Sequence, residues 1–184
     1  MNILFVFATK IENQLNSNKY DSIITGLGKL NASISLSKAI HSNKYDRIIN
    51  LGICGSIDES IPLFTIFSIS KVIEGDKDVF KGKNYLKLPT ITNNLKTETL
   101  ITQDRIIKNE SQRNHISILG GKLVDMECYA LAKTANAYKI PFYSFKIVSD
   151  YCLESSLKDI IIIAKKASHI LCEAILTLDQ RLDS

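Results

Sequence analysis

The sequence predicts an α/β fold in three layers, with helices on both faces of a central, mostly parallel mixed sheet. Short apolar runs alternate with amphipathic stretches along the chain, which is typical of parallel strands connected by helices. Two of the runs, Asn2–Ala8 and Arg47–Leu51, are almost continuously apolar, as strands covered on both faces should be. The chain has 184 residues, of which 45% are hydrophobic. We therefore expect a single domain, residues 1–184, that buries about 70% of its unfolded surface.

Three further segments have the pattern of strands. Ser22–Thr25 is short and weak, Leu63–Val72 partly alternates like a strand nearer an edge, and Phe142–Val148 is apolar enough to be buried. Residues 75–122 show patchy helix and strand signals among several glycines, and we expect excursions and loops there.

Apolar residues at helical spacing predict three helices. The first is Leu30–His41, with Leu36, Ala39 and Ile40 facing the core. The others are Val124–Ala137 and a long C-terminal helix, Leu157–Leu178.

The composition argues against several classes of protein. The net charge is only +4, and no stretch combines Lys and Arg with aromatic residues, so nucleic acid is not the expected partner. The first apolar run lacks a basic leader and is far shorter than the ~20 residues that span a bilayer, so we expect a cytoplasmic protein without membrane contact. The four cysteines show no metal-ligand spacing, and three of them fall in predicted core segments, where reduced cysteine acts as a small hydrophobic residue.

Two acidic residues stand in apolar surroundings. Glu127 lies within VDMECYALAK, where a helix would place it on the same face as Val124, Ala130 and Leu131. Asp150 ends the strand-like run PFYSFKIVSD. Burying a lone carboxylate costs several kcal/mol or forces it neutral. Such residues are therefore expected to be paired, hydrogen-bonded or used on a ligand.

Four segments fall at predicted strand ends, where open parallel sheets bind ligands. They are ATKIEN (8–13), GLGK (26–29), NLGICGS (50–56) and KIVSDYC (146–152). Gly28 and Gly52 would let the backbone approach a small ligand closely, and the helix that starts near Lys29 offers free N–H groups to an anion. Neither a P-loop nor a complete GxGxxG motif is present.

Together and in this order, these segments resemble the purine nucleoside phosphorylase and nucleosidase superfamily, specifically its methylthioadenosine/S-adenosylhomocysteine nucleosidase-like branch. The resemblance extends from residue 1 to about residue 178. It is strongest at 124–152, where VDMECYALAK and the following strand are similar to the family's Met-Glu helix and its strand ending in Ser-Asp. The fold implied is a shortened version of the family's, because 13 residues (13–25) replace a longer hairpin.

The resemblance implies a role for each matching residue. Glu12 falls where nucleosidases keep the carboxylate that activates water, and Asp150 where an acid protonates the purine. Met126 and Glu127 match the pair that packs under the ribose and bonds its hydroxyls, and Ser149 matches the neighbour of the acid. Lys146 stands where nucleosidases usually have Arg, and Ile107 ends the base-binding stretch 101–107. The glycines Gly28 and Gly52 complete the implied substrate-binding residues. No metal or organic cofactor is implied, and a homodimer or larger homo-oligomer is expected.

The chemistry of the reaction explains this set of residues. Breaking an N-ribosidic bond develops positive charge on the sugar and negative charge on the departing base. One carboxyl group must therefore be protonated to donate to the base, while another stays ionised to activate water.

Two departures from the family pattern bear on the nucleophile. Asn50 stands where phosphorylases commonly have Arg, which favours water over phosphate, and Ile53 replaces a small hydroxyl residue. The first hypothesis is therefore hydrolysis of an adenosine-like purine nucleoside, 5′-modified ones included. Two alternatives stay open: a phosphorylase that holds phosphate through Lys29 and backbone N–H groups, and a nucleoside-binding protein without catalysis.

The candidate residues also have simpler interpretations. Asp150 could cap the helix that follows it. Glu12 could be a solvated surface acid, and the stem of Lys146 could extend outward from an edge strand.

Overall fold

The computed structural model describes residues 1–15, 19–77, 84–90, 95–153 and 157–179. Within them the strands are β1 (Ile3–Phe7), β2 (Asp21–Ile24), β3 (Arg47–Ser56), β4 (Ile66–Glu74), β5 (Tyr85–Lys87), β6 (Lys96–Thr102), β7 (Leu123–Asp125) and β8 (Phe142–Asp150). The helices are α1 (Lys29–Ser42), α2 (Glu110–Ile118), α3 (Cys128–Ala137) and α4 (Leu157–Asp179).

The strands form one mixed, mostly parallel sheet, as predicted. Its order is β2-β1-β3-β7-β6-β4-β5, and β8 pairs with both β3 and β4. Because β3, β8, β4, β6 and β7 each pair with the next and β7 returns to β3, this part of the sheet closes on itself. The closure brings the carboxyl ends of β3 and β8 next to β7.

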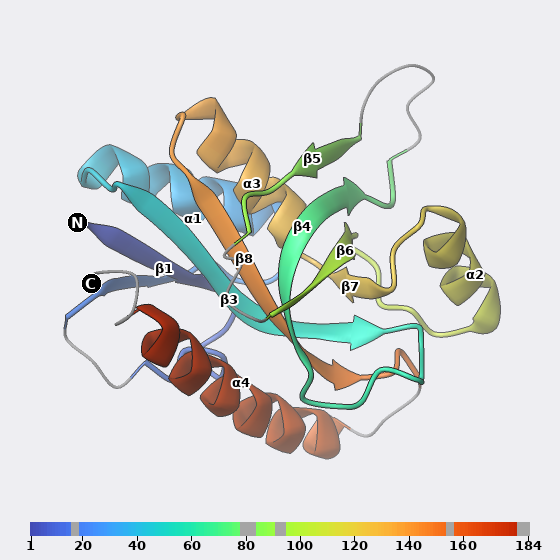
Figure 1. The fold of residues 1–184 in the computed structure, drawn as a ribbon. Coiled ribbons are helices and arrows are strands. Elements are labelled where there is room, and N and C mark those ends of the chain that lie inside the picture. The colour runs from blue at the N-terminus through green and yellow to red at the C-terminus, as the bar shows by residue number, and fades with distance from the viewer. Residues whose placement is uncertain (16–18, 78–83, 91–94, 154–156, 180–184) are drawn as a thin grey trace.

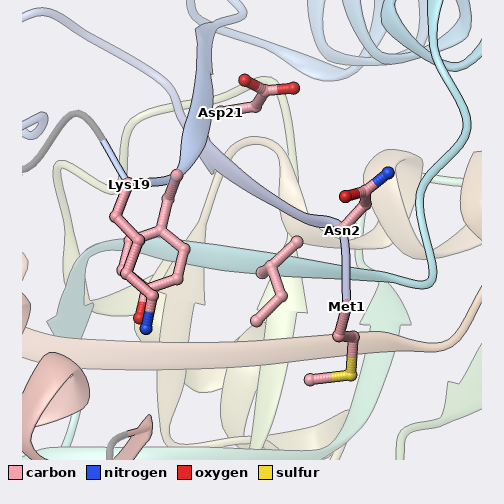
Figure 2. Close-up of a pocket in the computed structure, with 6 residues that line it drawn as sticks. Met1, Asn2, Lys19 and Asp21 are labelled. Carbon is pink, nitrogen blue, oxygen red and sulfur yellow. The ribbon is translucent and has the colours of Figure 1, made fainter.

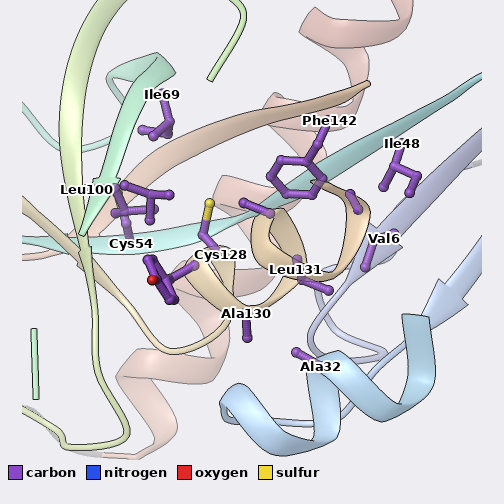
Figure 3. Packing of buried hydrophobic residues seen from close by; sticks show 14 of the residues in the cluster. Val6, Ala32, Ile48, Cys54, Ile69, Leu100, Cys128, Ala130, Leu131 and Phe142 are labelled. Atoms are coloured by element: carbon purple, nitrogen blue, oxygen red, sulfur yellow. The ribbon is translucent and has the colours of Figure 1, made fainter. Parts of the chain in front are cut away.

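Helices cover both faces of the sheet (Figure 1). On one face, α1 and α3 pack against side chains such as Val6 and Ile48, and Figure 3 shows this cluster around Cys128 and Leu131. On the other face, α4 packs its Leu171 against the alternate residues of the same strands. The three-layer α/β/α prediction is thus confirmed. Alternate side chains of β1 point to opposite faces of the sheet, so Leu4 and Val6 belong to one half of the core and Phe5 and Phe7 to the other.

The sequence located most elements but misjudged one of them. The first and third predicted helices correspond to α1 and α4, but the predicted helix Val124–Ala137 is wrong at its start. Val124 is a strand residue that pairs with Gly55 and Ile101, and the helix begins only at Cys128. Three residues of β7 carry too short a periodic pattern to be told from a helix start.

None of the described helices is long and apolar enough to cross a membrane. All four cysteines are free, and Cys152 alone is only partly buried.

Candidate active site

A pocket of about 370 Å³ opens at the carboxyl ends of β1, β3 and β8, beside the start of α3. Five residues implied by the resemblance line it: Glu12, Met126, Glu127, Ser149 and Asp150. The wall is otherwise largely apolar, with side chains from the first strand-end loop, the GLGK loop, β3 and α4: Ile11, Leu27, Ile53, Ile160 and Ile161. The three acidic side chains, far apart in the sequence, therefore converge on one cavity.

Glu12 is buried, with 5% of its surface exposed, so the solvated-surface interpretation is wrong. Its Oε2 accepts hydrogen bonds from the Thr9 backbone N–H at 2.8 Å and from Thr9 Oγ1 at 3.1 Å. Its Oε1 accepts from the Ile53 backbone N–H at 3.2 Å. Three donors are thus directed at one carboxyl group, and they fix its orientation at the pocket.

Glu127 stands at the N-cap position of α3, between β7 and the helix. Its Oε1 accepts a hydrogen bond from the Gly28 backbone N–H at 2.8 Å, which ties the GLGK loop to the pocket. Burial and the neighbouring negative charge of Asp125 raise the pKa of Glu127 to about 7, although Lys146 and the Gly28 N–H act in the opposite direction. This carboxyl group is therefore poised to change its charge near neutral pH.

Asp150 ends β8 and accepts on both oxygens. The Cys152 backbone N–H donates to Oδ1 at 2.8 Å, and Ser149 Oγ donates to Oδ2 at 2.8 Å. The Ser149 hydroxyl also lies 3.3 Å from the Cys54 carbonyl oxygen, so its single proton has two possible acceptors. A Cβ on Gly55 would lie 2.4 Å from Cys152 Sγ and 3.0 Å from Asp150 Oδ1, so only glycine leaves room for this arrangement.

Lys146 lies behind the pocket rather than in its lining, and it is 2% exposed on β8 between β3 and β4. The interpretation of an edge residue reaching solvent is therefore wrong. Its Nζ forms an ion pair with Asp125 Oδ2 at 2.9 Å. A Cβ on Gly52 would lie 3.0 Å from Lys146 Nζ and 3.1 Å from Glu12 Oε1, so Gly52 lets the ammonium group and Glu12 approach each other.

Two other predicted contacts are not made by side chains in the pocket. Ile107 packs with Ile101, Ile116 and Val124 in a separate apolar cluster and does not line the pocket. Gly28 acts through its N–H on Glu127, with φ at +89°, a conformation that favours glycine.

Sequence reasoning gave no individual role to Asp125, Thr102 or Thr9. Asp125 could have been found from two signals read together: an acid directly before the Met-Glu pair and a lone lysine in an apolar strand, each of which needs a buried partner. The two threonine hydroxyls leave no such trace, because threonine is common in strands and turns for other reasons.

A second pocket, of about 220 Å³, lies at the opposite, amino ends of β1 and β2 and is lined by Met1, Asn2, Lys19 and Asp21 among others (Figure 2). It lacks the convergent carboxylates of the first. Among the described residues, no group of three or more His, Cys, Asp or Glu side chains is placed to hold a metal ion.

Fold and pocket together define an α/β protein with an acid-lined small-ligand site at the strand ends. The Phosphorylase superfamily model matches residues 94–177. The chain is 28% identical over 161 residues to the 5′-methylthioadenosine/S-adenosylhomocysteine nucleosidase of Staphylococcus haemolyticus, covering 74% of this chain and 71% of that one. The nucleosidase of Staphylococcus epidermidis is 26% identical over the same shares.

Solved structures share the fold over nearly the whole chain. The Helicobacter pylori 5′-methylthioadenosine/S-adenosylhomocysteine nucleosidase, solved with butyl-thio-DADMe-Immucillin-A, superposes with a TM-score of 0.85 at 12% identity, covering 98% of both chains. Futalosine hydrolase from the same organism gives a TM-score of 0.84 at 11% identity, covering 98% of this chain and 97% of that one. The chain is thus similar to the phosphorylase superfamily over residues 94–177 and to nucleosidases over most of its length.

Proposed function

We propose that this protein hydrolyses the N-glycosidic bond of a purine nucleoside and releases the free base, with adenosine-like nucleosides, including 5′-modified ones, as substrates. The convergence of Glu12, Glu127 and Asp150 on one pocket carries the proposal. The names of the relatives, which are nucleosidases and a hydrolase, support the same class of reaction.

The residues divide the reaction between them. Glu12 takes a proton from a water molecule as the water oxygen attacks C1′, and the bond between C1′ and the purine nitrogen breaks. The electron pair of that bond leaves with the base, which takes a proton from Asp150. Glu127, in its ionised form, accepts hydrogen bonds from the ribose hydroxyls and stabilises the positive charge on the sugar, with Met126 packed beneath the ring.

The Ser149 hydroxyl can change its acceptor so that Asp150 can be protonated. While its hydroxyl donates to Asp150 Oδ2, that oxygen serves as an acceptor. Turning the hydroxyl toward the Cys54 carbonyl, 3.3 Å away, frees Oδ2 to carry the proton that the base will receive. The two positions of one hydroxyl thus match the two protonation states that a general acid must pass through.

The apolar part of the wall supports a ligand with a large apolar surface. Side chains of Ile11, Leu27, Ile160 and Ile161 line the pocket and are all at least 36% exposed, so their surfaces are available to a ligand. A purine face or a 5′-thioether group would bury them, at about 25 cal/mol per Å² of apolar surface.

Three features favour water over phosphate as the nucleophile. The Lys29 ammonium group is already paired with Glu74, at 3.0 Å, and with Asp76. The first N–H groups of α1 are also occupied, since Gly28 donates to Glu127 and Lys29 donates to Asp104. Among the described residues that line the pocket there is no Lys or Arg.

The test is base release from methylthioadenosine, S-adenosylhomocysteine, adenosine, inosine and guanosine, each with and without phosphate. We expect release in phosphate-free buffer with at least one adenosine-like substrate, and loss of release in Asp150→Asn. Turnover that requires phosphate and yields ribose 1-phosphate would favour the phosphorylase alternative. Binding without any release, by folded protein, would favour the non-catalytic alternative.

We also propose a homodimer, as the resemblance implies. The side chains of Leu27, Leu30 and Ile34 at the start of α1 are 58%, 72% and 45% exposed, and Leu27 lies on the rim of the pocket. An apolar strip of this kind beside a ligand site is typical of a protein interface. Sedimentation analysis tests it: a concentration-independent monomer would contradict the dimer.

A further inference from the structure

Asp125 and Lys146 form a buried ion pair beside the pocket, and the desolvation of two charged groups opposes folding. Asp125 and Lys146 are joined at 2.9 Å, and both side chains are 2% exposed. Removing two charges from water costs several kcal/mol per ion, so such a pair is weak support for stability. A role in organising the site accounts better for its presence.

Asp125 is held from three different elements. Its Oδ1 accepts a hydrogen bond from Thr102 Oγ1 at 2.6 Å at the end of β6, and its Oδ2 accepts from the Cys128 backbone N–H at 3.0 Å at the start of α3. Thr102 Oγ1 itself accepts from the Tyr129 backbone N–H at 3.0 Å. The direction of every bond is therefore fixed, and the Asp125 carboxylate has one defined orientation toward the Lys146 ammonium group on β8.

The ammonium group in turn lies near Glu12, and the charge of Glu12 is among the causes that raise the pKa of Lys146. A Cβ at Gly52 would touch both Lys146 Nζ and Glu12 Oε1, at 3.0 and 3.1 Å, so the two groups lie on the same side of one Cα atom. Lys146 does not line the pocket, and its charge acts on the site only through this placement. The position of the ammonium group is set by its partner, Asp125.

We infer that Asp125 is a positioning residue: its carboxylate holds the Lys146 ammonium group in place near Glu12. The inference rests on the proposed function for its kinetic consequences, and on the ion-pair geometry alone for its structural ones. Asp125 is among the residues that line the pocket, but its side chain is 2% exposed and both oxygens are bonded, so it acts through Lys146 and the start of α3.

The same arrangement acts on Glu127. The ionisable groups that act on Glu127 are Asp125, Lys146 and Glu12, and the buried thiol of Cys128 interacts with it as well. Burial raises the pKa of Cys128 to about 12, so that thiol is neutral at pH 7. After burial itself, Asp125 is the main cause that raises the pKa of Glu127, and Lys146 lowers it. Removing either member of the pair should move the titration of Glu127, in opposite directions.

The experiment follows Glu127 directly in the ligand-free protein, by ¹³C NMR of side-chain carboxyl groups, with Glu127→Gln to assign the signal. In the unaltered protein we expect a midpoint near pH 7. Asp125→Asn keeps the shape but places an amide NH₂ or a neutral oxygen against the ammonium group, and the midpoint should fall by at least about one pH unit. Lys146→Met should raise it. Asp21→Asn, the same change at an exposed strand start, should leave it in place.

Kinetics give the second readout. In Asp125→Asn, kcat/KM should fall at least about tenfold, because the Lys146 ammonium group near Glu12 is no longer held in place. The acid limb of the pH profile of kcat/KM should also move to lower pH, together with the NMR midpoint of Glu127. Asp125→Glu, which keeps the charge, should restore the acid limb of the profile.

A normal rate and an unmoved midpoint in Asp125→Asn would overturn the inference while leaving the proposed hydrolysis intact. If the unaltered protein releases no base, the NMR midpoints still decide the inference. If Asp125→Asn does not fold, an unmoved midpoint in Lys146→Met overturns it.

Discussion

Replacing Gly52 by alanine should damage the reaction far more than the fold. The Gly52 backbone lies outside the left-handed region, so alanine can adopt it without strain. The added methyl group would meet Lys146 Nζ at 3.0 Å and Glu12 Oε1 at 3.1 Å, where contacts below 3.4 Å are tighter than nearly all real ones. Both side chains must therefore move by a few tenths of an ångström.

The consequence for catalysis follows from the size of that movement. A 1 Å misplacement of a reacting group can cost about 100-fold in rate, so a shift of a few tenths of an ångström at Glu12 should lower kcat/KM about fivefold. Stability should stay within about 1 kcal/mol, because Gly→Ala at a compatible position restricts the unfolded chain and offsets part of the local strain. The assay is base release from the best nucleoside of the panel, beside urea unfolding of both proteins.

Gly120→Ala supplies the matched control. Gly120 follows the C-cap of α2 with φ at +80°, and a Cβ there would meet nothing within 4 Å. Its replacement should cost about 1–2 kcal/mol of stability through left-handed strain and leave kcat/KM unchanged. If Gly52→Ala keeps its rate within about twofold, or loses stability as Gly120→Ala does, Glu12 and Lys146 do not lie this close to Gly52.

Three further results are expected. Glu12→Gln and Asp150→Asn should each lower kcat about 10²–10⁴-fold, since each removes one acid–base group, while binding of a nucleoside analogue persists; a loss of affinity alone, measured by calorimetry, would point to a binding protein. Because the pKa of Glu127 is raised to about 7, kcat/KM should fall as pH drops below 7 and the carboxylate that holds the ribose is protonated; a flat profile between pH 5 and 8 would exclude this role. The folded state binds this proton more tightly than the unfolded state, so the stabilisation is present below pH 4.5 and is lost as pH rises through 7. Glu127→Gln should then be more stable than the unaltered protein at pH 8, by about 3 kcal/mol, and the difference in urea unfolding should vanish near pH 4.

The sequence located the sheet, α1 and α4 because their apolar patterns are long or continuous. It could not place β7, since a three-residue strand followed at once by a helix offers one unbroken apolar run. The error moved Glu127 from the N-cap position into the helix but did not hide it. A buried carboxylate is conspicuous in either setting, because the cost of burying it does not depend on secondary structure.

The contacts between side chains were beyond sequence reasoning for a different reason. The closure of β3, β8, β4, β6 and β7 is a property of strand pairing between distant segments, and no local pattern encodes it. Only this closure sets Asp125 on β7 opposite Lys146 on β8. The family resemblance showed that Lys146 stands where arginine is usual, but it did not identify Asp125 as the partner of the lysine.

The ion pair also explains why an ammonium group suits this site. An arginine fork bonds best to both oxygens of one carboxylate. Here Asp125 Oδ1 is taken by the Thr102 hydroxyl at 2.6 Å, which leaves Oδ2, already shared with the Cys128 N–H, to face β8. A single acceptor atom matches the point charge of Lys146 and cannot satisfy a fork. The geometry of Lys146 therefore depends on both Asp125 and the Thr102 hydroxyl. Changing Lys146 alone to arginine would leave guanidinium donors unpaired in a buried space.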